Sequence, residues 1–461
     1  MNRRRRLLLL LMCASQFFNV ANISSVNIAL PDIADDLDFS EATLPWVVSA
    51  YLVTFAGFLL VGGRVADLSG RRRVLTAGFV IFLVGTLLSA LAPTAPTLVA
   101  ARALQGIGAA TMIPASLGIL TTAFSAPAER SRAVAAFGAA GAVGFASGLI
   151  LGGAVTGTLG WRWIFGLAVP IAAVALALTR LVVPADAPSA LSRGDIDVIG
   201  ATTATAGLLA LVYALTNAGR SGWQSPATVA TLSGGLVLLA GFVLRQARAR
   251  NPLMPLTIWR RRGFPAAMII GCCLFAAWVG GNFYLSLMLQ RLLGYRPGEA
   301  AVALLPLAIG GLVGSTLAGR LLPRMGAKPL LVGGLAVYVA GFAMMTSVGA
   351  DTDYWPIVFT AVVLAVVGNS FTYVASTVVA LADAPAHEQS LVGGLFNTSM
   401  QVGGGLGLAI LAVAAATPTG VGNYQSAFLT AAGIACVGLL VAVFFVRREQ
   451  PSLPSDSTSV G

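Results

Sequence analysis

Long apolar runs dominate this chain and leave few folds open to it. Fourteen runs of about twenty residues stand between short polar connections. Apolar runs of this length cross the hydrocarbon core of a bilayer as helices, because a helix satisfies its own backbone hydrogen bonds there. The runs lie near residues 7–30, 44–63, 74–91, 98–120, 133–159, 163–183, 198–216, 227–243, 264–290, 300–321, 329–348, 355–382, 391–415 and 426–446. The expected fold is an all-α polytopic membrane protein with fourteen transmembrane helices.

The composition supports a lipid environment. Of the 461 residues, 57% are hydrophobic and only 10% are charged, whereas a soluble chain carries about 25% charged residues. The net charge is +11, but the basic residues flank the apolar runs and form no soluble basic domain. We therefore expect a lipid bilayer as a partner and no binding to nucleic acid.

The basic residues also predict the orientation in the membrane. With the N-terminus in the cytoplasm, fourteen crossings place 23 of the 28 basic residues on the cytoplasmic side. Removing one helix would reverse every later connection and destroy this bias. The predicted location is the bacterial inner membrane, with both termini in the cytoplasm.

The chain lacks the usual residues of a metal site or a hydrolase. Its four cysteines lie in apolar runs without zinc spacing, and its single histidine, His387, lies in a polar loop. We expect no metal, no cofactor and no enzyme activity. The arginines at positions 3 to 6 imitate a secretory signal, but the apolar run continues to Leu30, so an uncleaved first helix is expected.

A charged turn bounded by glycines separates the second and third runs. Residues 63–75 read GRVADLSGRRRVL. Gly63 and Gly70 permit sharp turning, and Asp67 can pair with Arg71 or with a helix dipole. The pattern G-x-x-x-D-x-x-G-R-R resembles the loop between helices 2 and 3 in the major facilitator superfamily of transporters. The resemblance implies that this hinge (Gly63, Asp67, Gly70, Arg71 and Arg72) latches two helical bundles in an outward-open state.

A weaker copy of the hinge appears in the second half, where residues 319–326 read GRLLPRMG. Such a repeat in a transporter implies two related bundles around a central cavity. We expect a six-helix bundle in residues 1–190, two additional helices in 191–250, a second six-helix bundle in 251–448, and a disordered tail in 449–461.

The fourth run contains a formal charge well inside an apolar segment. Burying Arg102 in a membrane costs about 2.5–3.5 kcal/mol even on lenient insertion scales. Gln105 and Gly106 share its helix face. The pattern R-x-x-Q-G-x-G resembles the superfamily's helix-4 motif, which is linked to proton coupling. The alternative is an arginine that extends to the outer membrane interface.

Five glycines recur along the fifth run, at Gly141, Gly144, Gly148, Gly152 and Gly153. Small residues four apart let helix backbones approach closely. With the W-R-W-x-F at residues 161–165, this run resembles the antiporter motif of the fourteen-helix drug:proton antiporter family. Where that motif has proline after glycine, this chain has a leucine, at position 149. Ordinary helix packing is the alternative explanation.

Polar residues form a stripe in the first run and recur in the second half. Residues 22–31, NISSVNIALP, are similar to the fourteen-helix family's L-D-x-T-I-V-N-V-A-L-P, with Asn22 in place of the aspartate. A polar stripe can face a substrate cavity or can join neighbouring helices by hydrogen bonds. The cavity candidates are Gln16, Asn19, Asn22, Asn27, Asn282, Tyr284, Asn369, Asn397 and Gln401.

All 17 acidic residues lie in loops or at helix ends, so no carboxylate is expected at the bilayer centre. Proton relays usually use such a group. One hypothesis is that coupling uses Asp32, near a helix end, through a water-filled cavity toward Arg102. The other hypothesis, which we prefer, is that a positive cavity favours neutral or anionic cargo over cations. The proton-coupling candidates are thus Arg102, Asp32 and Gln105.

Together, the motifs resemble the fourteen-helix drug:proton antiporter family along nearly the whole chain. The resemblance implies a secondary active transporter that exports small amphipathic, drug-like or antibiotic-like compounds by proton antiport and alternating access. Such a protein would confer antibiotic resistance by multidrug efflux. The alternative is a membrane sensor or scaffold that keeps the transporter fold without coupled transport.

Overall fold

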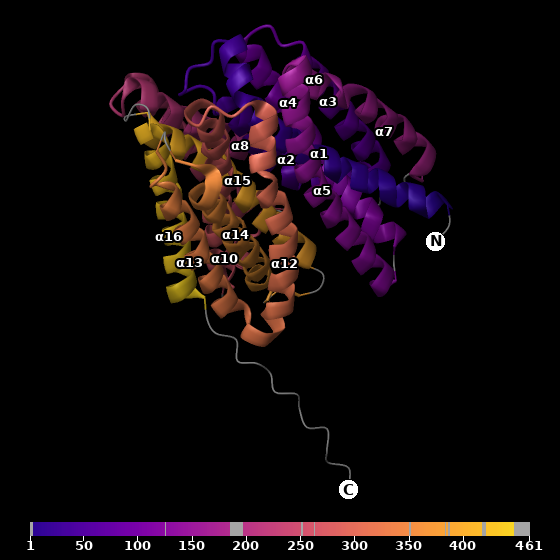
Figure 1. Ribbon diagram of the computed structural model, residues 1–461. Coiled ribbons are helices and arrows are strands. Elements are labelled where there is room, and N and C mark those ends of the chain that lie inside the picture. Colours follow the sequence, from indigo (N-terminus) through magenta and orange to yellow (C-terminus); the bar gives the residue numbers. More distant parts are fainter. Residues whose placement is uncertain are drawn as a thin grey trace.

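The computed structural model describes residues 3–124, 126–184, 197–249, 252–261, 263–349, 352–382, 384–385, 388–416 and 421–446. The described chain is helical throughout its length (Figure 1). Its helices are α1 (Arg3–Asp36), α2 (Trp46–Ser69), α3 (Arg71–Ala90), α4 (Ala95–Ala123), α5 (Pro127–Leu159), α6 (Arg162–Gly166), α7 (Ala168–Val182), α8 (Val198–Ser221), α9 (Pro226–Arg248), η2 (Leu256–Arg260), α10 (Phe264–Leu287), η3 (Met288–Leu292), α11 (Pro297–Ala303), α12 (Leu305–Met325), α13 (Ala327–Met345), η4 (Tyr354–Val358), α14 (Phe359–Leu381), α15 (Gln389–Ala415) and α16 (Val421–Phe445).

Each of the fourteen predicted runs forms a helical span. Twelve spans within the described residues are long and apolar enough to cross a membrane, and α2 and α8 contain the shorter apolar segments Trp46–Leu59 and Thr202–Ala218. The sequence does not predict the interruptions within some spans. Leu167 separates α6 from α7, and Leu304 separates α11 from α12. The all-α, fourteen-span fold is confirmed.

Two glycines with left-handed backbone conformations end corresponding helices in the two halves. Gly70 follows α2 with φ 99°, and Gly326 follows α12 with φ 80°. Only glycine adopts this region without steric cost, so each position reverses the chain within one residue. The hinge and its weaker copy are therefore the same kind of turn.

Helices pack mainly within the first half of the chain (residues 3–182) and within the second half (residues 256–446). α1 packs along α5, and α4 packs against both α2 and α3. In the second half, α13 packs on α14, and α10 packs on α15 and α16. α8 and α9 pair with each other, and α8 also contacts α2 and α15. The predicted bundle boundary near residue 190 and the tail 449–461 lie outside the described residues.

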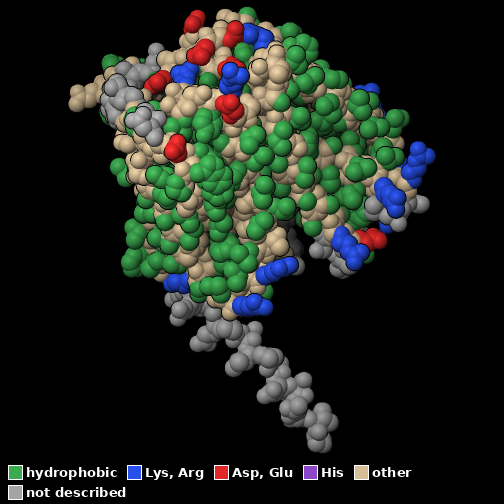
Figure 2. All heavy atoms as spheres, viewed as in Figure 1, with side chains coloured by type: hydrophobic (Ala, Val, Ile, Leu, Met, Phe, Trp, Pro, Cys, Tyr) green, Lys and Arg blue, Asp and Glu red, His purple; other side chains and the backbone are tan. Residues whose placement is uncertain are grey.

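Charged side chains separate to the two ends of the molecule, with an apolar surface between them (Figure 2). The acidic end carries the connection from α1 to α2, with Asp35, Asp36 and Glu41. The basic end carries the start of α1 and the turns at Gly70 and Gly326. On the face shown, the surface is hollowed at the basic end between α5 and α12 (Figure 2).

Among the described residues, four polar contacts join the first half to the second, and all four lie at the acidic end. Ser286 donates to the Asn27 carbonyl at 2.8 Å, and Gln290 donates to the Ile28 carbonyl at 3.0 Å. The other two are the Arg291–Asp35 ion pair at 2.7 Å and the Asn423–Glu41 hydrogen bond at 3.1 Å. These contacts hold the halves together at one end, opposite the hollow.

Candidate functional site

Arg102 is the largest polar side chain buried in the described core, with 1% of its surface exposed. It projects from α4 into the first half. Its Nε donates to the Val47 carbonyl at 2.9 Å, and its Nη1 donates to Gln105 Oε1 at 2.7 Å and also to Asn22 Oδ1. The guanidinium is therefore anchored to α1, α2 and its own helix, and it does not extend to the membrane interface.

An aromatic ring completes the surroundings of the guanidinium. The Tyr51 ring centroid lies 4.6 Å from Arg102 Cζ, a cation–π arrangement. The Tyr51 hydroxyl in turn donates to Asn19 Oδ1. Asn19 and Asn22, both predicted on the first-helix stripe, thus contact the arginine cluster directly or through one residue.

The polar network around Arg102 continues through neutral groups. Gln105 Nε2 donates to Thr86 Oγ1 at 2.9 Å, and the Ser89 hydroxyl donates to Gln105 Oε1 at 3.5 Å. Among the described residues, Arg102 forms no ion pair. A buried cation held only by neutral acceptors keeps its positive charge uncompensated locally, which favours an anion or an electron-rich group nearby.

The carboxylates of the α1 end have different partners. Asp35 pairs with Arg291, and Asp36 pairs with Arg162. Asp32 is half-buried on the last turns of α1 and forms no hydrogen bond or ion pair with a described residue. The described structure does not bring Asp32 into contact with Arg102.

The remaining stripe residues differ in how their polar groups are used. Three buried side-chain oxygens have no hydrogen-bond partner among the described residues: Gln16 Oε1, Gln401 Oε1 and Asn27 Oδ1. Asn282 donates to the Trp278 carbonyl of its own helix at 2.7 Å. Asn369 is half-buried, Asn397 is exposed, and Tyr284 is buried toward the acidic end. Buried acceptors without partners are uncommon and are available to a ligand that donates hydrogen bonds.

The glycines of the fifth span allow close packing on two sides. A Cβ at Gly148 would lie 2.1 Å from Ser24 Oγ, and one at Gly144 would lie 2.6 Å from the Phe17 carbonyl oxygen. Gly141 and Gly152 face α1 in the same way, opposite Gln16 and Ser25. Gly153 instead faces Ala301 of α11 in the second half. α5 is one continuous helix over Pro127–Leu159.

The hinge arginines bind the carbonyl ends of neighbouring helices. Arg71 donates to the Gly118 carbonyl at 2.7 Å and to the Thr122 hydroxyl, both near the end of α4. Arg72 donates to the Arg180 carbonyl at 2.8 Å, near the end of α7. Cations are stabilised at helix C-termini. These contacts lie within the first half. The Asp67 side chain lies outside the described residues, so its predicted pairing with Arg71 stays a prediction.

Comparison with known proteins places these features in a family. The family model described as Major Facilitator Superfamily matches residues 12–408. The chain belongs to the Major Facilitator Superfamily. It is a transporter of that superfamily and not an enzyme.

The curated relatives of this transporter include antibiotic resistance and export proteins. It is 38% identical over 410 residues to the "Puromycin resistance protein pur8" of Streptomyces alboniger, covering 86% of this chain and 79% of the relative. It is 34% identical over 460 residues to the "Cephamycin export protein CmcT" of Amycolatopsis lactamdurans, covering 97% of this chain and 92% of the relative. The POT family transporter PepTSo has the same fold, with a TM-score of 0.72, 16% identity and coverage of 96% and 98%.

The sequence predicted Arg102 and Gln105 but not three other side chains of their network, Tyr51, Thr86 and Ser89. All three are polar residues in apolar runs, and many such residues only bond to their own helix. What distinguishes these three is their position opposite α4, which depends on how the transporter's helices pack.

Proposed function

We propose that this transporter exports small amphipathic, antibiotic-like compounds across the bacterial inner membrane. The named relatives that act in antibiotic resistance and export support this assignment. We place the basic end and both termini in the cytoplasm, because basic residues collect on the cytoplasmic side of membrane proteins. The acidic end then faces outward.

The observation that carries the proposal is a buried guanidinium that pairs with no carboxylate in the part of the chain that the structure describes. Arg102 is held by Val47, Asn22 and Gln105, all of them neutral acceptors. A cavity beside this cluster would hold a positive potential, so it favours neutral or anionic cargo over organic cations. The spare acceptors of Gln16 and Gln401 would receive hydrogen bonds from such a cargo.

The contacts between the halves correspond to one state of an alternating-access cycle. With the acidic end joined by Arg291–Asp35 and Ser286–Asn27, and a hollow at the basic end, the arrangement is inward-open. The opposite state requires these contacts to separate and the hinge at Gly70 to approach the second half. Gly153 lies where α5 meets α11 and permits the close approach at the closed end.

We propose that protons drive export and that Asp32 carries them. Of the three carboxylates on α1, Asp32 is the one without a hydrogen-bond or ion-pair partner among the described residues. It lies one turn beyond the α1 carbonyls that accept from Ser286 and Gln290. Protonation there would change the charge next to the contacts that close the acidic end. Arg102 and Gln105 would respond through Asn22, which lies on the same helix as Asp32.

Accumulation assays in cells expressing the transporter test the proposal. We expect a neutral or anionic antibiotic to accumulate less than in control cells, and Arg102→Ala to abolish the difference. Preferential efflux of a quaternary ammonium dye would contradict the charge preference. The sensor or scaffold alternative predicts no change in accumulation for any compound and no effect of Arg102→Ala.

A further inference from the structure

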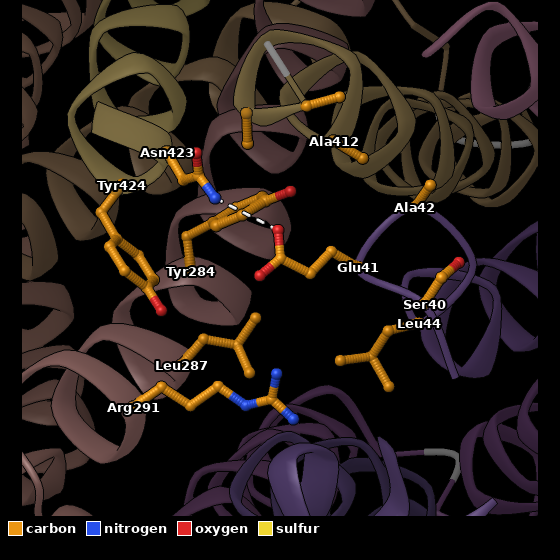
Figure 3. Close-up of a pocket in the computed structure, with 12 residues that line it drawn as sticks. Ser40, Glu41, Ala42, Leu44, Tyr284, Leu287, Arg291, Ala412, Asn423 and Tyr424 are labelled. Atoms are coloured by element: carbon orange, nitrogen blue, oxygen red, sulfur yellow. Dashed lines mark hydrogen bonds between the residues drawn. The ribbon is translucent and has the colours of Figure 1, made fainter. Parts of the chain in front are cut away.

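A separate cavity of about 250 Å³ opens at the acidic end, and Arg102 is not among the residues that line it (Figure 3). One wall is the α1–α2 connection, with Glu41 and Leu44. The opposite wall comes from the second half, with Tyr284, Leu287 and Tyr424. Glu41 is exposed, so the cavity is accessible from outside the protein. It lies across the joint between the two halves.

The charged groups at the cavity and its rim, Glu41, Arg291 and the Asp35 that pairs with Arg291, sum to one negative charge. The guanidinium of Arg291 on its rim is paired with Asp35 at 2.7 Å. The Glu41 carboxylate accepts a hydrogen bond from the neutral Asn423 amide at 3.1 Å and forms no ion pair with a described residue. One carboxylate charge in the cavity is therefore left without a cation.

The other groups in the cavity suit a cation that donates hydrogen bonds. Tyr284 and Tyr424 line the cavity beside the Asn423–Glu41 pair, and aromatic faces attract organic cations (Figure 3). Asn423 Oδ1 is buried without a hydrogen-bond partner, so it needs a donor. Leu44 and Leu287 supply an apolar surface for a small hydrocarbon group.

We propose that this cavity binds a compact organic ammonium, with the ammonium between Glu41 and Asn423 and the hydrocarbon group against the tyrosine rings and leucines. The cavity is too small for a drug-sized molecule. Its charge preference is opposite to that proposed for the Arg102 region, so it is a distinct site. Because its walls belong to different halves, the bound ammonium stabilises the state in which the acidic end is closed.

Binding is tested with benzylamine on the purified full-length protein, by calorimetric titration and thermal unfolding. Benzyl alcohol and benzoate have the same ring without the cation. We expect benzylamine to bind at least about tenfold more tightly than either. Glu41→Gln should remove this preference, whereas Glu299→Gln, a matched change at the same end but outside the cavity, should keep it. Equal binding of the three compounds, or unchanged benzylamine binding by Glu41→Gln, would overturn the proposal.

A second pair of variants separates the role of the ring from effects on folding. Tyr424→Phe keeps the aromatic face and should retain benzylamine binding, whereas Tyr424→Leu should weaken it. Equal affinity of the two variants for benzylamine would show that the ring has no role and would refute the proposed arrangement. The natural ligand could be a lipid ammonium headgroup or a free amine, which have the same chemistry. Weaker benzylamine binding in bilayers with phosphatidylethanolamine than in pure phosphatidylglycerol would show that the lipid headgroup occupies the cavity. Equal binding in the two bilayers would show that free amines are the ligand.

The effect on transport rests on the proposed function, but binding does not. External benzylamine should slow export by the wild type and not by Glu41→Gln. Benzylamine binding without inhibition of export would refute the claim that the bound ammonium stabilises the closed state, but it would not contradict the ammonium site itself. An absence of transport in all variants would count against the proposed function alone.

Discussion

At the scale of single residues, the geometry of the arginine matters as much as its charge. Arg102 reaches Val47, Asn22 and Gln105 with one planar group, which the point charge of lysine cannot do. We predict that Arg102→Lys lowers transport by about tenfold, since one lost hydrogen bond to a charged group is worth about 1.5–3 kcal/mol. Initial export rates at equal membrane abundance measure this. Wild-type rates in Arg102→Lys would show that charge alone suffices.

A second residue-scale prediction concerns Asp197, which precedes α8. Its buried carboxylate accepts from the Gly200 amide and from Gln246, both at 2.8 Å, and pairs with Arg245. Burial raises the pKa of Asp197, but the hydrogen bonds from Arg245, Gly200 and Gln246 outweigh it, and the pKa is lowered overall. The ionised Asp197 therefore contributes its full stabilisation when the pH is above the ordinary aspartate pKa of about 3.9, which applies to the unfolded chain. This stabilisation is lost as the pH falls through the lowered pKa of the folded state.

Accordingly, the melting temperature of the wild type should fall more between about pH 6 and pH 3 than that of Asp197→Asn. At neutral pH, Asp197→Asn should be less stable by about 1 kcal/mol, because asparagine still caps α8 but loses the ion pair with Arg245 and the charge on its hydrogen bonds. Asp353→Asn, at an exposed site on the acidic end, is the control and should leave both results unchanged. Parallel pH profiles for wild type and Asp197→Asn would contradict the assigned role.

At the scale of helices, the contact between α1 and α5 depends on individual glycines. A Cβ at Gly148 would lie 2.1 Å from Ser24 Oγ and 2.5 Å from the Ala21 carbonyl oxygen. Gly148→Ala should therefore separate the helices and lower the melting temperature and folded yield, by about 1–3 kcal/mol of stability. Gly138→Ala and Gly157→Ala meet no atom within 4 Å and should be neutral or slightly stabilising. Equal effects at the three positions would refute this packing argument.

Helices were the most predictable level of the structure. Lipid forces each apolar run to satisfy its backbone internally, so run length alone located all fourteen spans. The breaks at Leu167 and Leu304 were not predicted, because apolar residues continue through both positions. The hydrogen bond from Arg102 to Asn22, 80 residues apart, depends on how α1 and α4 pack, which helical periodicity within one segment does not determine.

At the scale of the whole molecule, the closed acidic end should depend on charge pairing between the halves. Asp35 is exposed, and such pairs contribute about 0.2–1 kcal/mol. Arg291→Asp should therefore open this end modestly, and Asp35→Arg with Arg291→Asp should restore closure. Spin-label distances between sites at Asp38 and Asp353 measure the opening. If the double variant does not recover the wild-type distance, the Arg291–Asp35 ion pair does not contribute to closing the acidic end.

We propose that a proton gradient drives export by a transporter that holds the buried cation Arg102 in its first half. Transport into or out of proteoliposomes under an imposed pH gradient tests it most directly, with wild type, Asp32→Asn, Asn22→Asp and Arg102→Ala compared at equal protein content. We predict gradient-dependent flux for the wild type, loss of that dependence in Asp32→Asn, and no flux in Arg102→Ala. Wild-type flux that is unchanged when the gradient is collapsed would contradict the claim.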